Sequence, residues 1–166
     1  MSVISSPPSR FSPSEVNQIA KTLYGFEVSV KVLDSERDQN FYLKREDGKE
    51  FVLKISNPAE DVELIKLQVA SLKHISSFDS SIHIPRTIQT LDGNFFIQQN
   101  GCFIRLQSFI EGHFMKDIEN PEPFLLKEFG TFMGKLDVAF KEFGYPDLKR
   151  KWIWDVRNID FLQSHL

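Results

Sequence analysis

The sequence predicts an α+β fold, in which one antiparallel sheet of five to six strands is flanked by helices. Apolar residues recur at helical spacing in three segments of the chain. Between these segments apolar and polar residues alternate, as in half-buried strands, and Asp-Gly or Asn-Gly dipeptides mark the turns. The elements follow one another as helix, three strands, helix, two or three strands and helix.

The first helix is expected over residues 13–24. Ser12 and Glu15 have the spacing of a capping box, and Pro13 occupies the first helical position. Gly25 stands where a helix commonly ends, because glycine adopts the left-handed backbone conformation easily. These signals predict a short helix with defined ends.

Three strands are expected after this helix. Residues 26–32 alternate between apolar and polar side chains, which is typical of a strand with one buried face. Residues 40–45 and 50–56 form the arms of a predicted hairpin, because Asp47-Gly48 between them is a strong turn signal.

The second half of the chain is expected to contain a helix, a meander of strands and a long helix. Asn57 is the expected cap of the second helix, with Pro58 in its first turn and Glu60 three residues on. The expected bounds are 57–74 for this helix, 86–91, 94–99 and 102–109 for the strands, and 120–143 for the last helix, with one more helix beginning near Asn158. The buried stripe of the last long helix is expected to be Leu125, Phe129, Phe132, Leu136, Ala139 and Phe143.

Composition narrows the class of protein. The chain has 166 residues, and Phe supplies 16 of its 21 aromatic residues, which we interpret as core material. The charges nearly balance, with 20 Lys and Arg against 23 Asp and Glu, so no nucleic-acid partner is expected. No apolar run is long enough for a membrane span, so no membrane partner is expected. The lone Cys102 favours a reduced, cytoplasmic location.

Lys54 is the first candidate functional residue. It lies in an apolar run, Phe51–Ile55, where an ammonium group loses solvation unless an anion meets it. Two interpretations remain open: Lys54 extends its amine to solvent from a sheet face, or it binds an anionic ligand.

Gln68 is the second candidate, because it lies in the apolar stripe of the second helix between Leu64 and Leu72. A polar group on a core face needs a partner. Gln68 either satisfies a backbone group or takes part in a site.

The loop at residues 35–40 is the third candidate. It contains no glycine, yet Ser35, Arg37 and its backbone N–H groups could receive phosphate oxygens. An ordinary turn is the alternative. The four histidines and the single cysteine are not spaced as metal ligands, so no metal cluster is expected.

Several motifs, in this order, resemble the aminoglycoside phosphotransferase-type kinases, which are protein-kinase-like. The subgroup most similar is that of hydroxylysine-kinase-like proteins, including phosphotransferase domains fused to class III aminotransferases. The segments that carry the resemblance are Ser35–Phe41, Phe51–Ser56, Leu64–Gln68, Leu72–Ile75, Arg105–Gly112, Gly130–Asp137 and Trp152–Asp155.

The resemblance implies a kinase-like N-lobe over residues 12–110, after a flexible lead-in at 1–11. It implies that residues 111–166 are the hinge and the first helices of a C-lobe that is otherwise missing. Lys54 would contact the α- and β-phosphates of ATP, and the loop at 35–40 would cover the triphosphate. The implied nucleotide-binding residues are Lys54, Ser35, Arg37, Asn40, Gln68, Glu63, Gln107, Phe109 and Ile110.

Two departures from the family pattern bear on function. Gln68 occupies the place of the acidic residue that orients the lysine, and either Gln68 or Glu63 could take that role. The chain also lacks the catalytic H-x-D-x-x-x-x-N loop and the Asp that follows it to hold magnesium. No catalytic or metal-binding residue is therefore assigned, and the ligands of Mg²⁺ are expected in the missing lobe.

The leading hypothesis is the ATP-binding portion of a small-molecule kinase that phosphorylates a hydroxyl of an amino-alcohol or aminoglycoside-like substrate. We expect this portion to be inactive alone. The alternative is a non-catalytic, kinase-like interaction or pseudokinase module. Apolar surface normally covered by a second lobe is expected to promote homodimerisation.

Overall fold

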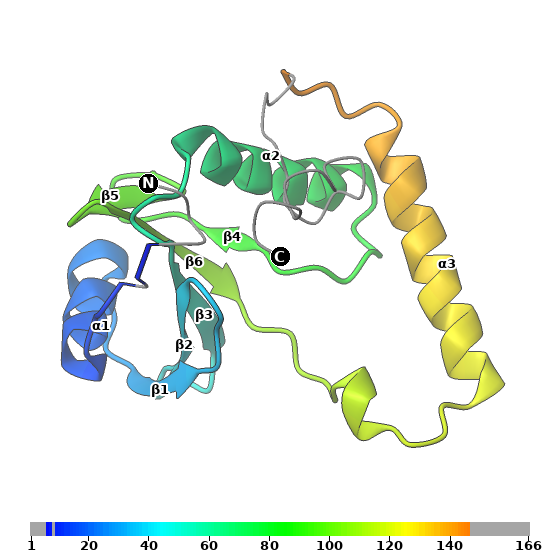
Figure 1. Ribbon diagram of the computed structural model, residues 1–166, viewed down its shortest axis with the longest axis horizontal. Helices are drawn as coiled ribbons and strands as arrows, with labels where there is room; N and C mark the ends of the chain where they lie inside the picture. Colours follow the sequence, from blue (N-terminus) through cyan, green and yellow to red (C-terminus); the bar gives the residue numbers. More distant parts are fainter. Residues whose placement is uncertain (1–5, 8, 147–166) are drawn as a thin grey trace, which may run out of the picture.

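A computed structural model describes residues 6, 7 and 9–146 of the protein, and its fold confirms the predicted α+β class (Figure 1). A six-stranded antiparallel sheet is combined with helices. The helical elements are α1 (Pro13–Ile19), which continues as the π-helical turn η1 (Ala20–Tyr24), α2 (Val62–Phe78), the 3₁₀ turn η2 (Met115–Asp117) and α3 (Pro123–Phe140). The strands are β1 (Ser29–Leu33), β2 (Gln39–Lys44), β3 (Glu50–Ile55), β4 (Thr87–Ile88), β5 (Ile97–Gln99) and β6 (Cys102–Ser108).

The sheet order is β1-β2-β3-β6-β4, and β5 also pairs with β6. The three strands predicted at 86–91, 94–99 and 102–109 are present, but the prediction that they form a meander was wrong, because β4 and β5 do not pair with each other. β5 pairs with the start of β6 and β4 with its end, so that two short strands share one edge of β6. The chain between them leaves the sheet in a turn, where the N–H of Leu91 donates to the carbonyl of Leu23 in η1.

The two faces of the sheet have different compositions. One face carries Phe41, Leu53 and Leu106, which are fully buried against α1 and η1 in the main core. The opposite face carries Lys54 and Arg105, and α2 packs on that side, where Gln68 bonds to Arg105 (Figure 1). The alternation of side chains along each strand therefore separates an apolar core from a polar face.

The predicted start of the second helix was wrong by several residues. α2 begins at Val62, and its cap is Asp61, whose side chain accepts the N–H of Glu63 at 2.9 Å. Asn57 cannot cap α2 because its side chain is engaged elsewhere, in bonds that include the N–H of Ala59. The helix also continues past the expected end at residue 74, to Phe78.

The long helix α3 lies apart from the sheet, beside the end of α2 (Figure 1). Ala139 is buried in a small cluster with Ile75 and Ile82, and the carbonyl of Ala139 lies 2.7 Å from Nε2 of His74. The predicted buried stripe is confirmed at Phe132 and Leu136, which pack against this cluster, but the interpretation of the Phe residues as core was wrong at Phe129, which is 53% exposed. Next to the side of α3 that packs against this cluster, the apolar side chains of Leu126, Phe129 and Met133 are exposed.

Two sequence-based expectations fall on residues 147–166, outside the described part of the chain. They are the family-like segment Trp152–Asp155 and the helix near Asn158. Of the helices within the described residues, none is long and apolar enough to span a membrane.

Gly25 offers a test of how the first helix ends. It has φ +77°, as predicted for a helix terminus, and a Cβ there would lie 3.3 Å from Cδ2 of Leu91. We expect Gly25→Ala to lower the free energy of unfolding by about 1–2 kcal/mol, mainly from left-handed backbone strain. Urea denaturation measures this change.

Gly112→Ala is the matched control, because Gly112 has no positive φ and a Cβ added to it would meet no other atom within 4 Å. Its effect should stay within about 0.5 kcal/mol. Equal losses for the two variants would contradict a conformational requirement at Gly25.

Candidate functional site

A row of three polar residues crosses the sheet on the face opposite the main core. Asn40 on β2 is in register with Lys54 on β3, and Lys54 is in register with Arg105 on β6. Residues opposite each other on neighbouring strands have side chains within reach of one another. The strand pairing thus brings two of the candidate residues, Asn40 and Lys54, together with an arginine.

Lys54 is partly buried in this row. Burial lowers the pKa of its ammonium, the neighbouring charge of Arg105 lowers it further, and Asp38 acts in the opposite direction. The ion pairs formed within residues 9–146 do not include Lys54. An amine with these surroundings favours binding of an anion, which would relieve the repulsion from Arg105.

Arg105 is the most buried charged residue of the row, with 3% of its surface exposed. Its Nη2 donates to Oε1 of Gln68 on α2, so the partner of Gln68 is a guanidinium and not a backbone group. Nε and Nη1 of Arg105 are buried and have no acceptor among the described residues. Burial lowers the pKa of Arg105, against the attraction of Asp38 and Glu60.

The loop between β1 and β2 lies at one end of this row. Asn40 donates from Nδ2 to Oγ of Ser35 at 3.1 Å, while its own Oδ1 is buried without a donor in the described part of the chain. Nη2 of Arg37 lies 3.8 Å from Oε1 of Glu36. The backbone carbonyl of Arg37 accepts from Nδ2 of Asn57. Ser35, Arg37 and Asn40 therefore belong to one local unit.

Asn57 fixes this loop to the start of α2 and to the N-terminal segment. It is fully buried, and its Nδ2 lies within 3.4 Å of the carbonyls of Ser6, Pro7 and Arg37. Its backbone N–H donates to Asp38 at 3.1 Å. One side chain thus joins three segments that are distant in the sequence.

The N-terminal segment makes further contacts with the sheet. The side chain of Gln39 bonds to both the N–H and the carbonyl of Phe11, each at 2.8 Å. Ser9 and Phe11 are buried. Residues 9–11, expected to be part of a flexible lead-in, are instead packed against the start of β2.

Glu63 lies in the first turn of α2 and does not join the row. Its Oε1 accepts from Nζ of Lys66 at 2.7 Å, and both side chains are about half exposed. The structure thus brings Gln68 to the sheet, through Arg105, and directs Glu63 to a neighbour on its own helix. Which residue orients Lys54 in a complex stays a prediction.

The remaining candidates, Gln107, Phe109 and Ile110, lie at the end of β6 and just after it. Gln107 is in register with Val52, two residues along the same face from Arg105 and Lys54. Phe109 donates its N–H to the carbonyl of Glu50 at 3.1 Å. Ile110 is exposed.

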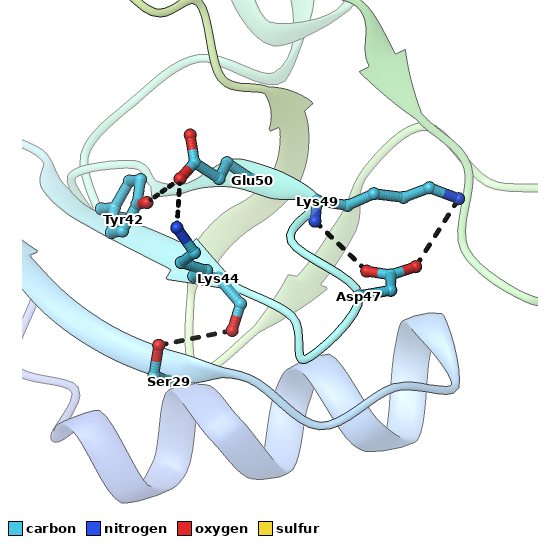
Figure 2. A network of polar contacts seen from close by, with 6 residues as sticks. All are labelled: Ser29, Tyr42, Lys44, Asp47, Lys49 and Glu50. Atoms are coloured by element: carbon cyan, nitrogen blue, oxygen red, sulfur yellow. Dashed lines mark hydrogen bonds and ion pairs between the residues drawn. The ribbon is translucent and has the colours of Figure 1, made fainter.

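The connection after β6 is held by a polar network on the β2–β3 hairpin (Figure 2). Tyr42 and Lys44 both donate to Oε1 of Glu50, and the ring of Phe109 meets Tyr42 edge-on, with centroids 5.1 Å apart. At the turn, Asp47 bonds to the N–H of Lys49, as the Asp-Gly signal predicts for a tight hairpin (Figure 2).

Arg105 and Asn57 are the residues of the site that sequence reasoning missed. The sequence places Arg105 at a polar position of an otherwise apolar strand, and that break in the pattern was the available signal. Asn57 has the sequence context of a helix cap, and this context gave no indication that its side chain bonds to the N-terminal segment and to the loop at Arg37.

Metal ligands are not gathered in this region. No group of three or more His, Cys, Asp or Glu side chains within the described residues is arranged to hold a metal ion. The side chains of the row suit an anion instead, because Lys54 and Arg105 place two positive charges side by side there.

The fold is similar to the N-terminal half of known small-molecule kinases. An amicoumacin kinase solved with AMP-PNP and Ca²⁺ superposes with a TM-score of 0.73, at 16% identity, over 93% of this chain and 48% of the kinase. A spectinomycin phosphotransferase solved with ADP and spectinomycin gives a TM-score of 0.66, at 18% identity, over 94% of this chain and 46% of the enzyme. The class is therefore a kinase-like N-lobe.

The chain belongs to the phosphotransferase enzyme family, whose family model matches residues 29–162. Hydroxylysine kinase of Danio rerio is 29% identical over an alignment of 181 positions that covers all of this chain and 50% of the relative. The chain thus spans about half the length of the curated relative it matches. The family predicted from the sequence motifs is confirmed.

Asn57→Ala tests the link between the loop and α2. We expect a loss of about 2–4 kcal/mol in the free energy of unfolding, because the substitution removes a fully buried amide together with its bonds to the carbonyls of Ser6 and Pro7 and to the N–H of Ala59. Asn94→Ala is the control, since Asn94 is exposed and its bonds with Thr90 use only its backbone. A loss for Asn57→Ala no larger than that of the control, measured by urea denaturation, would show that Asn57 does not hold these segments.

Proposed function

We propose that this chain is the ATP-binding portion of a small-molecule phosphotransferase. The observation that carries the proposal is the pair of Lys54 and Arg105, side by side on the face of the sheet that α2 packs against. A triphosphate supplies the charge that this pair lacks. Membership of the phosphotransferase family supports the same conclusion.

Lys54 contacts the α- and β-phosphates in this proposal, and the loop at 35–40 lies over the triphosphate. Ser35 and Arg37 offer donors, and Asn40 holds Ser35 in place. The adenine ring lies toward Gln107, Phe109 and Ile110 in this proposal, where the chain leaves the sheet. The network around Glu50 keeps that segment fixed, which lowers the entropy lost on binding.

Magnesium is the proposed companion of ATP, and the described residues do not fit it. They gather no set of carboxylates. We therefore assign Mg²⁺ ligands to a part of the phosphotransferase outside these residues, together with the group that accepts the proton of the substrate hydroxyl. The chain alone is then a nucleotide-binding unit without turnover.

The proposed phosphate acceptor is a hydroxyl of an amino-alcohol or aminoglycoside-like molecule. The similarity to hydroxylysine kinase, to an amicoumacin kinase and to a spectinomycin phosphotransferase supports this class. The proposed location is the cytoplasm, where ATP is available.

Lys54→Met tests the proposal while keeping the length of the side chain. Isothermal titration calorimetry with ATP and Mg²⁺ should show an affinity lower by about 1.5–3 kcal/mol, the usual contribution of a hydrogen bond to a charged group. Lys31→Met is the control, since Lys31 lies in the same sheet but on its exposed edge strand. Unchanged binding for Lys54→Met, or no binding by the folded wild type, would refute a nucleotide site at Lys54.

The second candidate function is a non-catalytic, kinase-like interaction module. It is favoured by the α3 apolar stripe, which we define as Leu126, Phe129, Met133 and Phe140. These residues recur at helical spacing on one side of α3, and each is 39–53% exposed. A continuous exposed stripe of this kind is typical of an interaction surface.

Self-association through the α3 apolar stripe can be measured by sedimentation velocity. We expect the wild type to form dimers as its concentration rises, and the double variant Phe129→Ser with Met133→Ser to stay monomeric. Lys127→Ser on the same helix is the control and should behave as the wild type. A wild type that is monomeric at every concentration would exclude homodimerisation through this stripe.

A further inference from the structure

The candidate site holds two positive charges, those of Lys54 and Arg105, directly opposite each other on neighbouring strands. Lys54 and Arg105 are register partners on antiparallel strands, a position in which like charges destabilise a sheet. Neither residue takes part in any of the ion pairs formed in the described part of the chain. The pair is therefore maintained against an electrostatic cost in the absence of a ligand.

Arg105 contributes most to this cost because it is the more buried of the two. It is 3% exposed, and its Nε and Nη1 have no acceptor among residues 9–146. Native structures rarely leave buried donors unpaired, and those that do commonly have a functional reason. Asp38 on the loop and Glu60 before α2 are the carboxylates that act on Arg105 through space.

Gln68 determines how much charge Arg105 presents. Arginine has donors only, so the amide oxygen of Gln68 must face it, as observed. An amide satisfies one N–H but carries no formal charge, and the guanidinium keeps its full positive charge. A carboxylate at position 68 would instead form an ion pair with Arg105 and cancel that charge.

We propose that Arg105 is a specificity-determining residue of the nucleotide site, held in place and left fully charged by the neutral Gln68, so that the site favours ligands with several phosphate charges. The inference rests on the proposed function, because it concerns the same site. Arg105 acts through its field on the ligand beside Lys54, since its unpaired nitrogens are covered by protein. It is a positioning residue, not a catalytic one.

The direction in which Gln68→Glu changes the affinity for ATP tests the proposal. A carboxylate that oriented Lys54 would strengthen ATP binding or leave it unchanged, whereas a carboxylate that neutralises Arg105 weakens it. We expect the affinity for ATP to fall by about tenfold in calorimetry, and the affinity for AMP to change less, as electrostatic complementarity requires. Inorganic tripolyphosphate should follow ATP. Ser77→Glu is the control, because it adds the same charge at an exposed position of α2, and it should bind ATP within about threefold of the wild type.

Arg105→Met provides an independent measurement. It should weaken ATP binding and still melt at or above the temperature of the wild type without nucleotide, because replacing a buried unpaired charge by an apolar side chain is often neutral or stabilising. The pKa of Lys54, followed by carbon NMR of labelled lysine, should rise when the repulsion from Arg105 is removed.

The outcomes separate this inference from the proposed function. If Lys54→Met binds ATP as the wild type does, the proposed function fails and the inference with it. If Lys54→Met weakens binding but Gln68→Glu does not, only the inference is overturned. An Arg105→Met variant with a lower melting temperature, unchanged ATP affinity and an unchanged Lys54 pKa would mean that Arg105 has a structural role alone. Should that variant not fold, Gln68→Glu still decides.

Discussion

The pairing of β3 with β6 is the constraint on which the rest of the structure depends. A single register sets Lys54 beside Arg105 on one face and Leu53 beside Leu106 on the other. Because side chains alternate along a strand, a slip by one residue would bury the two cations in the main core and expose its leucines. Burial of the leucines in the core therefore selects the register of β3 and β6. That register in turn places the two positive charges of the candidate site beside each other.

Two residues outside the sheet, Gln68 and Asn57, hold the site in place through hydrogen bonds and not through apolar packing. Gln68 reaches Arg105 from α2, while Asn57 joins the loop after β1 to the turn before α2. Each support is a single amide that serves as donor or acceptor without adding charge. Neutral amides can hold backbone and guanidinium groups in place while leaving the balance of charge to a ligand, which a network of carboxylates could not do.

Sequence reasoning was reliable where the determining interactions were local. The capping box at Ser12, the end of the helix at Gly25 and the hairpin at Gly48 each depend on residues within one turn, and each was predicted. The sharing of one β6 edge by β4 and β5 depends on residues far apart in the chain, and it was missed. Lys54 was found because its apolar neighbours made its charge conspicuous, whereas the role of Arg105 required knowledge of which strand lies beside β3.

The division of the β6 edge between two short strands also limits how this protein can associate. Exposed strand edges offer unpaired N–H and carbonyl groups to other chains, and long flat edges invite sheet-to-sheet growth. Here the edge at β6 is occupied by segments of 2 and 3 residues, with a turn interrupting them, and the opposite edge is a strand of 5 residues. Neither edge presents a long template for a further strand, so intermolecular contacts are directed to side chains and not to the backbone.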